Sequence, residues 1–542
     1  MKSTMQFVPL SVARLLEQGA SVHGDATVAT WTGDGVRTRT YREVGERAHR
    51  LAGALRALGV SGDDRVATLM FNNNEHLEVY LAVPSMGAVL HTLNIRLLPE
   101  QLVYIAGHAQ DRVLIVDAPL VPLAAKLLPA MTTVQHVVVT GGADLGSLDG
   151  VSAEVHAYDE LVAGAEPLAS WPSVAETDAA ALCYTSGTTG NPKGVAYSHR
   201  SIWLHSMQVC AAEGFDLGPA DTVLAVVPQF HAMAWGLPYA AFMSGASLLM
   251  PDRFLQAAPL AQMIAEQRPT LAGAVPSIWS DLLHHLDQHG GGDLSSLREV
   301  VVGGSAVPPS LMREFLDRYG MRIVHAWGMT ETSPLGTVAR PPAGLDEQAE
   351  WDYRYTQGRL PAAVEGRLIG PDGEQLPWDG QSVGELQVRG NWVTASYYLE
   401  DEPDKFDDGW LRTGDVGTLT PDGFLRLTDR SKDVIKSGGE WISSVELENL
   451  LMGHPDVVEA SVIGVPDDRW GERPLATVVL AEGSNLAVAE LRDYLSGKVA
   501  KWQLPERWAL IDEVPKTSVG KFDKKLLRAR FADGELDVTT LG

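Results

Sequence analysis

The sequence predicts an α/β fold, with a large multi-subdomain N-terminal α/β region that contains a small β unit, and a small mobile α+β C-terminal domain. Three patterns predict it. Apolar runs alternate with amphipathic helical segments as far as residue 302, as in strands and helices that share a sheet. From residue 364, short alternating runs are separated by Pro-Asp-Gly turns. Beyond residue 433, a capped helix and two strands indicate a separate domain.

The first α/β stretch begins with an amphipathic helix at residues 41–59, where Val44, Leu51 and Leu55 recur at helical spacing and Gly59 ends the helix. A strand at 65–71 and a helix at 77–86 follow. An apolar run at 88–93, a helix at 99–107 and a run at 113–116 continue the alternation. The same alternation is predicted later in the chain, with apolar runs at 222–227, 246–250 and 299–302 and helices at 235–242 and 260–266.

A short polar stretch at 428–433 lies between apolar runs and predicts a domain linker. We therefore expect a large domain at residues 1–429, a linker at 430–433 and a small C-terminal domain at 434–542. Ser443 and Glu446 have the Ser-x-x-Glu spacing of a capping box that opens a helix at 445–452. Strands are expected at 457–465 and 476–480.

Composition excludes several classes of protein. The chain has 542 residues, 45% hydrophobic and 21% charged, as in a multidomain globular protein. Its formal net charge of -26 argues against a broad basic surface for nucleic acid, so any anionic ligand must be held locally. Two cysteines are too few for a disulfide framework, and no apolar stretch is long enough for secretion or a membrane span. These features predict a cytoplasmic protein.

A loop rich in glycine and hydroxyl residues follows the apolar run at 179–183. Its glycines let backbone N–H groups approach a polyphosphate, and Lys193 adds a positive charge. It differs from the Walker form because Gly194, rather than Ser or Thr, follows that lysine. The pattern favours binding of ATP phosphates, while a flexible surface loop is the alternative for this segment taken alone. The proposed donors are Thr185, Ser186, Gly187, Thr188, Thr189, Gly190 and Lys193.

This loop closely resembles the signature loop of the adenylate-forming superfamily, which includes acyl-CoA synthetases, the adenylation domains of peptide synthetases and firefly luciferase. The resemblance covers nearly the whole chain and implies ATP, Mg²⁺ and coenzyme A as cofactors. Further motifs occur in the family's order, at Pro228–His231, Gly303–Ala306, Trp327–Thr332, Thr413–Asp415, Asp429–Arg430, Lys436–Glu440 and Pro515–Lys521.

The resemblance implies a role for each residue around the nucleotide. Glu331 would bind the metal and Thr330 a phosphate, in keeping with the preference of Mg²⁺ for oxygen ligands. Trp327 would stack on adenine, where many relatives have tyrosine. Asp415 would accept the ribose hydroxyls, and Arg430 would reach the nucleotide. The rest of the implied site is Gly303, Gly304, Ser305 and Ala306 on the other face of the base, with Gly328 and Met329 beside Trp327.

The C-terminal lysine cluster would supply the catalytic cation. By spacing alone, Lys516, Lys521, Lys524 and Lys525 cannot be told apart, and the family resemblance selects Lys521 for the adenylation step. The expected catalytic set is Lys521, Thr185, Glu331 and His231. In the family's second half-reaction the C-terminal domain rotates about the linker at 430–433, and Lys432 matches the hinge position. The resemblance then implies that Lys436, Gly438, Gly439 and Glu440 move near the active site for the coenzyme A step, and that Trp441 lies near adenine.

The acyl pocket would be lined by the apolar stretch 230–239, with His231, Trp235 and Gly304 touching the acid. Together with residues 436–443, this stretch looks most like bacterial fatty-acyl-CoA synthetases, which favours a medium-chain or long-chain fatty acid. The alternative is a pocket filled by these aromatic side chains that leaves room only for a short acid, such as a methylthio-alkanoate. Pocket length decides between them, since one methylene changes binding by only about 1 to 3 kcal/mol.

Three other functions stay open at this point. The fold permits luciferase-like oxidation of an adenylate, and it permits adenylation for a carrier protein in trans. The third is a catalytically dead nucleotide-binding module, against which the intact Lys193, Glu331, Asp415 and Lys521 argue. The sequence also leaves open a homodimer and peripheral contact with a membrane.

Overall fold

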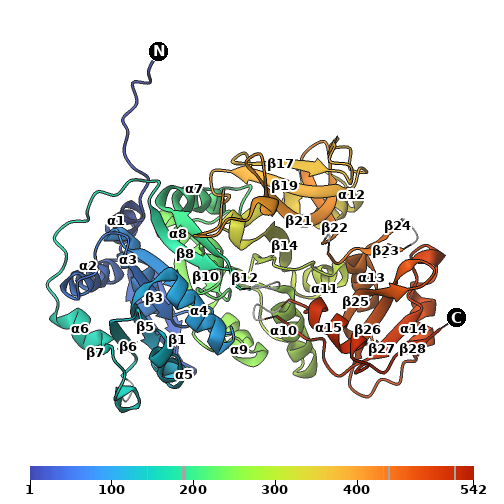
Figure 1. The fold of residues 1–542 in the computed structure, drawn as a ribbon, viewed down its shortest axis with the longest axis horizontal. Coiled ribbons are helices and arrows are strands. Elements are labelled where there is room, and N and C mark those ends of the chain that lie inside the picture. The colour runs from blue at the N-terminus through green and yellow to red at the C-terminus, as the bar shows by residue number, and fades with distance from the viewer. Residues whose placement is uncertain (143–144, 186–190, 431, 438–439, 518–520, 542) are drawn as a thin grey trace.

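The computed structural model describes residues 1–142, 145–185, 191–430, 432–437, 440–517 and 521–541. Two N-terminal sheets with their helices occupy one end of the molecule, an antiparallel β unit lies beside them, and the C-terminal domain occupies the other end (Figure 1). The mixed α/β architecture with a small C-terminal domain confirms the fold class predicted from the sequence. None of the described helices combines the length and the apolar composition that crossing a bilayer requires.

The first sheet is parallel except for its last pair of strands. Within the described residues its strand order is β7-β6-β5-β3-β4-β8-β9, and β8 and β9 form an antiparallel hairpin. The strands are β3 (Arg65–Leu69), β4 (Val89–Thr92), β5 (Asp111–Asp117), β6 (His136–Thr140), β7 (Glu154–Ala157), β8 (Ala179–Tyr184) and β9 (Gly194–Ser198). The helices of this region are α1 (Val12–Val22), α2 (Tyr41–Ala57), α3 (Asn74–Ser85), α4 (Pro99–Ala109), α5 (Val121–Leu127), α6 (Tyr158–Gly164) and α7 (His199–Cys210).

The second sheet begins as a parallel sheet in the order β14-β13-β12-β10-β11-β1, with β2 antiparallel at its edge. Its strands are β1 (Thr27–Trp31), β2 (Val36–Thr40), β10 (Thr222–Ala225), β11 (Ser247–Met250), β12 (Leu271–Ala274), β13 (Glu299–Val302) and β14 (Arg322–Gly328). The helices here are α8 (Leu237–Ser244), α9 (Ala257–Gln267), α10 (Pro276–Gln288), α11 (Pro309–Tyr319) and α12 (Glu347–Arg354).

The small β unit expected from residue 364 continues this second sheet. Beyond β14 the order is β15-β16-β22-β21-β19-β17-β18, with β20 on β21, and all of these pairs are antiparallel. The strands are β15 (Leu335–Val338), β16 (Gly358–Arg359), β17 (Val364–Ile369), β18 (Gln375–Leu376), β19 (Gly384–Gly390), β20 (Phe406–Asp407), β21 (Trp410–Leu419) and β22 (Phe424–Arg430).

The C-terminal domain has its own sheet and its own core. Ser443 caps α13 by accepting a hydrogen bond from the N–H of Glu446 at 3.0 Å, as the Ser-x-x-Glu spacing predicts. The strands are β23 (Ile435–Ser437), β24 (Glu440–Ile442), β25 (Val457–Asp467), β26 (Gly471–Leu480), β27 (Arg507–Leu510) and β28 (Thr539–Thr540). The helices are α13 (Ser444–Met452), α14 (Val488–Leu495) and α15 (Lys524–Ala532).

One local prediction was wrong at its boundary. The helix expected at 235–242 begins only at Leu237, because Met233, Ala234 and Trp235 have φ values of 53°, 50° and 56°, which are left-handed. Asp415 lies inside β21, which passes through Gly414 at φ 73° and shifts its register at a bulge just beyond, between Val416 and the next residue. The strand β22 likewise extends through Arg430 into the expected hinge.

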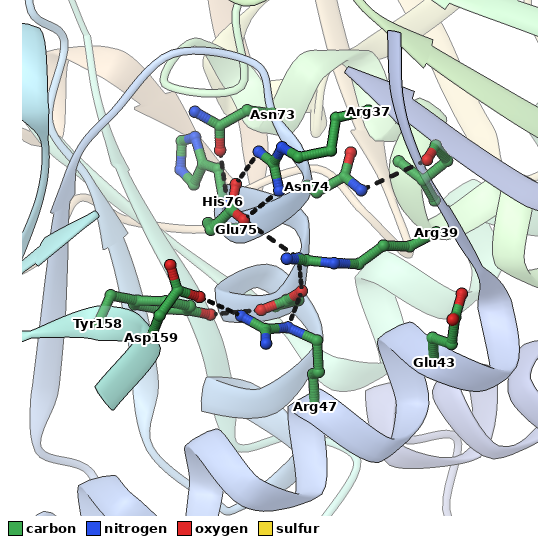
Figure 2. Close-up of polar contacts among 12 residues, drawn as sticks. Arg37, Arg39, Glu43, Arg47, Asn73, Asn74, Glu75, His76, Tyr158 and Asp159 are labelled. Atoms are coloured by element: carbon green, nitrogen blue, oxygen red, sulfur yellow. Dashed lines mark hydrogen bonds and ion pairs between the residues drawn. The ribbon is translucent and has the colours of Figure 1, made fainter. Parts of the chain in front are cut away.

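An ion network fastens α3 to three neighbouring elements (Figure 2). The fully buried carboxylate of Glu78 on α3 accepts from Arg47 of α2 at 2.7 Å, from Tyr158 of α6 at 2.7 Å and from Arg39 of β2. Beside it, Glu75 pairs with Arg37 of β2. The network therefore joins α2, α3, α6 and β2 around one buried acid.

Replacing Glu78 by alanine is expected to destabilise the protein by about 3 kcal/mol, because it leaves the partly buried Arg39 and Arg47 without their shared partner. The lowered midpoint of thermal unfolding measures the loss. Glu365→Ala is the matched control, since its ion pair with Arg389 is exposed and screened by solvent, so its loss should leave the midpoint almost unchanged. Equal midpoints for the two variants would contradict this reading of the network.

Candidate functional site

One cavity of about 290 Å³ lies where the parallel strands of the second sheet end. Segments that follow the carboxyl ends of β10, β12, β13 and β14 contribute to its wall, which is the usual position of a ligand site in an α/β sheet. The β8–β9 hairpin and the loop before α15 complete it. The cavity is lined by these predicted residues: Thr185, Lys193, His231, Trp235, Gly303, Gly304, Trp327, Gly328, Met329, Thr330, Glu331, Arg430 and Lys521.

The base of the predicted phosphate loop is closed by two hydrogen bonds. The N–H of Thr185 donates to the carbonyl of Lys193 at 2.9 Å, and the hydroxyl of Thr185 accepts from the N–H of Lys193 at 3.1 Å. The Lys193 ammonium pairs with Glu402 and lies 5.2 Å from the ring centroid of Tyr397. The side chains of Thr185 and Lys193 thus reach the cavity wall from the hairpin.

The stretch that carries His231 is held from the first sheet. The side chain of Asn72 donates to the carbonyls of Ala225 and Val227 at 2.7 and 2.8 Å and accepts from the N–H of Gln229 at 2.7 Å. The Tyr80 hydroxyl donates to the carbonyl of Gln229. Because both side chains are buried, the segment leading to His231 has a fixed path.

His231 is neutral at physiological pH. Burial, together with the positive charges of Lys521 and Arg96, lowers its pKa to about 3. Its imidazole can therefore offer a hydrogen bond donor and an acceptor to a ligand without adding a charge to the cavity.

The apolar wall is built around Trp235. Its indole packs beside Gly273 and Gly303, where a Cβ atom would stand 3.7 and 3.6 Å from the ring, an ordinary van der Waals distance. Gly304 has φ 86°, and a Cβ there would stand 3.8 Å from Cε of Lys521. These glycines therefore lie directly beside the indole and the lysine chain. The other apolar lining residues include Val227, Phe230, Val275 and Ile278.

The predicted adenine and ribose residues contact one another. Nε1 of Trp327 donates to Oδ2 of Asp415 at 2.8 Å, and Nε of Arg430 lies 3.2 Å from Oδ1 of the same carboxylate. The negative charge of Asp415 raises the pKa of Arg430. Gly336 packs against the indole of Trp327, where a Cβ would clash at 2.2 Å. The geometry fixes the indole, the carboxylate and the guanidinium as one unit, with Trp327 and Arg430 at the cavity wall.

Glu331 is buried on a short 3-10 turn, Thr330–Thr332, directly after β14. Its Oε1 accepts from the hydroxyl of Tyr397 at 2.6 Å, and its backbone carbonyl accepts from the N–H of Thr394 at 2.8 Å. The carbonyl of Thr330 accepts from the Tyr197 hydroxyl at 2.6 Å. The carboxylate is thereby oriented at the cavity, and its oxygens are the hard ligands that Mg²⁺ prefers.

The structure distinguishes the four C-terminal lysines, which sequence spacing alone could not do. Lys516 pairs with Glu459 at 2.6 Å and Lys524 pairs with Glu448 at 2.8 Å, so both ammonium groups are held inside the C-terminal domain. Lys525 is exposed on α15. Lys521 lines the cavity, and reciprocal bonds with Thr517 hold its backbone. Burial, opposed in part by nearby acids, lowers the pKa of Lys521 to about 8.

This pKa predicts a pH dependence for adenylation. If the ammonium form is required, kcat/KM falls as the pH rises through about 8, because the cation is present below its pKa and lost above it. Bound polyphosphate favours the cation, so the fall in kcat comes at a higher pH than the fall in kcat/KM. The pH profile of ATP–pyrophosphate exchange measures both. Lys521→Arg keeps its charge and should lose the fall near pH 8, and a wild-type kcat/KM that stays flat well above pH 8 would contradict the assignment.

Several predicted residues lie away from the cavity wall or outside the described residues. Ser305 and Ala306 follow Gly304 but do not line the cavity. Lys432 and Lys436 do not line it either, and the backbone N–H of Lys436 donates to the carboxylate of Glu472. The predictions that lie outside the described residues are Ser186, Gly187, Thr188, Thr189, Gly190, Gly438, Gly439 and the side chains of Glu440 and Trp441.

Some lining residues were not singled out from the sequence. Thr413 and Thr517 lie within motifs that the sequence analysis recognised, so both could have been predicted as site residues. Arg96, Tyr397 and Lys405 come from loops without a motif. Tyr397 gave no sequence signal for its contact with Glu331, since the two residues are brought together only by the fold.

Comparison with known proteins places the chain in a family. Residues 16–398 match the AMP-binding enzyme family, and residues 446–521 match the AMP-binding enzyme C-terminal domain. The chain is 46% identical to a 3-methylmercaptopropionyl-CoA ligase of Ruegeria pomeroyi, covering 98% of this chain and 99% of that protein. It is 43% identical to a medium-chain-fatty-acid–CoA ligase of Ectopseudomonas oleovorans, covering 97% and 96%.

A solved structure shares the fold over the full length. The crystal structure of an anthranilate CoA ligase in complex with anthranoyl-AMP has a TM-score of 0.88, 27% sequence identity, and coverage of 99% of this chain and 100% of the other. These matches extend over both the large region and the C-terminal domain. The chain therefore belongs to the AMP-binding enzyme family and, within it, to the adenylate-forming acyl-CoA synthetases.

Proposed function

We propose that this chain is an ATP-dependent acid:CoA ligase whose reaction is carried by the cavity described above. A carboxylate attacks the α-phosphate of ATP, which gives an acyl-adenylate and pyrophosphate. The thiol of coenzyme A then attacks the acyl carbon, which gives the acyl-CoA and AMP. One observation carries the proposal: Lys521 of the C-terminal domain shares a cavity with Thr185, Lys193, Trp327 and Glu331 of the large region.

The residue roles follow from where their groups lie. Thr185 and Lys193 flank the loop that we assign to the β- and γ-phosphates. Trp327 offers a π face to the adenine, and Asp415 offers carboxylate oxygens to the ribose. The Lys521 ammonium balances the negative charge that builds up on the reacting phosphate as pyrophosphate leaves.

Mg²⁺ suits this site because its donors are oxygens on a buried turn. Glu331 would hold the ion, which would offset the charge of the triphosphate, while the Thr330 hydroxyl would contact a phosphate. The chain's own contribution is to orient the carboxylate, which the hydroxyl of Tyr397 does through a 2.6 Å hydrogen bond.

The thioester step is assigned to a rotated C-terminal domain. In the described arrangement Lys521 lines the cavity, while Lys436 lies on β23 and does not line it. We propose that rotation about residues 430–433 withdraws Lys521 and brings residues 436–441 toward the acyl-adenylate. This proposal includes the expected domains, 1–429 and 434–542, on either side of the hinge.

For the acid we propose a medium-chain or long-chain fatty acid. The wall formed by Val227, Phe230, Trp235 and Ile278 is apolar, which favours an aliphatic chain. A short sulfur-containing acid is the second candidate, because the Ruegeria relative at 46% identity is a 3-methylmercaptopropionyl-CoA ligase and the indole of Trp235 occupies part of the space.

A panel of acids tests this assignment. CoA thioester formation is measured with straight-chain acids from C2 to C18 and with 3-methylmercaptopropionate, and kcat/KM is compared. The proposal predicts a maximum at C8 or longer, with about tenfold or greater loss for the sulfur acid. A maximum at 3-methylmercaptopropionate would overturn the choice of acid while leaving the ligase reaction intact.

The setting of the enzyme is part of the proposal. Cys183 and Cys210 are free thiols, and burial raises the pKa of each, to about 12 and about 11. Such thiols suit a reducing compartment, and we place the enzyme in the cytoplasm. A homodimer in solution, which sedimentation measures directly, is also a proposal.

A further inference from the structure

A cluster of metal-binding side chains lies at the edge of the first sheet, apart from the cavity. His136 is on β6, and Glu154 and His156 are on β7, the terminal strand of the sheet as described. The two strands are parallel, with His136 opposite Glu154 and Val138 opposite His156. Since side chains alternate along a strand, Glu154 and His156 share one face, and His136 meets them on that face.

The three ligand atoms are spaced as a tetrahedral cation requires. Nδ1 of His136 lies 3.3 Å from Nε2 of His156 and 3.4 Å from Oε2 of Glu154. Nε2 of His156 lies 3.9 Å from the same carboxylate oxygen. Zinc bonds of about 2.0–2.1 Å to nitrogen or oxygen, at tetrahedral angles, place two ligand atoms about 3.3 Å apart. Small side-chain adjustments would therefore bring all three atoms onto one ion.

The surroundings favour binding of a cation. Burial, followed by the charge of His136, lowers the pKa of His156. The rings are 14% and 23% exposed and the Glu154 side chain is 74% exposed, so an ion could enter from solvent and keep a water as its fourth ligand. Two imidazoles and one carboxylate are a common zinc donor set.

We propose that His136, Glu154 and His156 form a binding site for a zinc-type divalent cation that fastens β7 to β6. The site stands apart from the ligase reaction, because the sheet order places β7 at the opposite end from the β8–β9 hairpin that carries Thr185 and Lys193. Its consequence is structural. The strand β7 leads directly into α6, whose Tyr158 and Asp159 join the ion network of Figure 2. An ion bound here would therefore stabilise the packing of β7 and α6.

Zinc titration of the full chain tests the site. Tag-free protein is stripped with EDTA, titrated with zinc chloride by calorimetry without ATP, and its thermal midpoint is recorded with and without zinc. We expect one zinc equivalent per chain and a higher midpoint. His156→Ala should weaken binding about 100-fold and abolish the rise in midpoint, and Glu154→Gln should weaken binding about tenfold.

A second histidine pair is the matched control. His285 and His289 lie one turn apart on and just beyond α10, with ring centroids 4.1 Å apart. His289→Ala should bind zinc as the wild type does. If the wild type takes up no zinc, or if Glu154→Gln binds it with wild-type affinity, the site is refuted. Because Glu154 is mostly exposed, its variant decides the question even if His156→Ala fails to fold.

Discussion

Lys521→Ala is expected to lower the rate of acyl-adenylate formation by about 100- to 1,000-fold, the loss found when one preorganised charge or hydrogen-bond donor is removed from a transition state. The alanine removes the cation that lies beside Gly304 and would balance the charge of the leaving pyrophosphate. Thioester formation from supplied acyl-adenylate should persist, because that step is assigned to a state from which Lys521 has moved away. ATP–pyrophosphate exchange and CoA thioester formation measure the two steps separately.

The matched control is Lys516→Ala, which removes the same cation five residues away. Lys516 pairs with Glu459 and does not line the cavity, so both half-reactions should stay close to wild type. If Lys521→Ala lost both steps equally, its role could not be confined to adenylation. If it lost neither, the catalytic cation would have to be sought elsewhere in the cavity.

Glu331→Gln is expected to reduce kcat/KM for adenylation by about 100-fold, roughly 2.7 kcal/mol of transition-state stabilisation. The substitution keeps the shape of the side chain and its contact with Tyr397, but it removes the negative charge proposed to hold Mg²⁺. The Mg²⁺ concentration that gives half-maximal rate should therefore rise. Initial rates of pyrophosphate release over a Mg²⁺ series measure both effects.

Tyr397→Phe separates charge from orientation. It removes the 2.6 Å hydrogen bond to Glu331 and keeps the carboxylate, so we expect about a tenfold loss in rate with a smaller shift in Mg²⁺ dependence. An unchanged Mg²⁺ requirement in Glu331→Gln would mean that this carboxylate does not hold the metal.

The sequence motifs alone contain most of the residues that line the cavity. Thr185 is far from Trp327 and Glu331 in the chain, yet each occurs in a short pattern whose glycines, hydroxyls or charges indicate phosphate or nucleotide chemistry. The alternating apolar runs also predicted the parallel strands, because buried strands and amphipathic helices leave distinct periodicities. Each of these signals is local and can be read within a few residues.

Long-range contacts could not be read in this way. Tyr397 orients Glu331 from 66 residues away, and Asn72 reaches across to the segment before His231, with no pattern in the sequence to pair them. The start of α8 was missed because hydrophobicity does not report that Trp235 has a left-handed backbone. The small β unit was recognised, but its continuity with the second sheet depends on strand pairing that apolar spacing does not encode.

The choice among the C-terminal lysines shows the same limit. Four lysines within ten residues look alike in sequence, and only the ion pairs of Lys516 and Lys524 with Glu459 and Glu448 take two of them out of consideration. Burial then distinguishes Lys521 by lowering its pKa to about 8. These effects arise from packing, so they appear only once the chain is folded.

Exchange of labelled pyrophosphate into ATP, measured without coenzyme A, reports whether the cavity forms an acyl-adenylate. We expect exchange that requires a carboxylic acid and Mg²⁺, survives in Lys516→Ala and is lost in Lys521→Ala. Wild-type protein that forms CoA thioesters without any acid-dependent exchange, or that shows no exchange with any acid from C2 to C18, would contradict it.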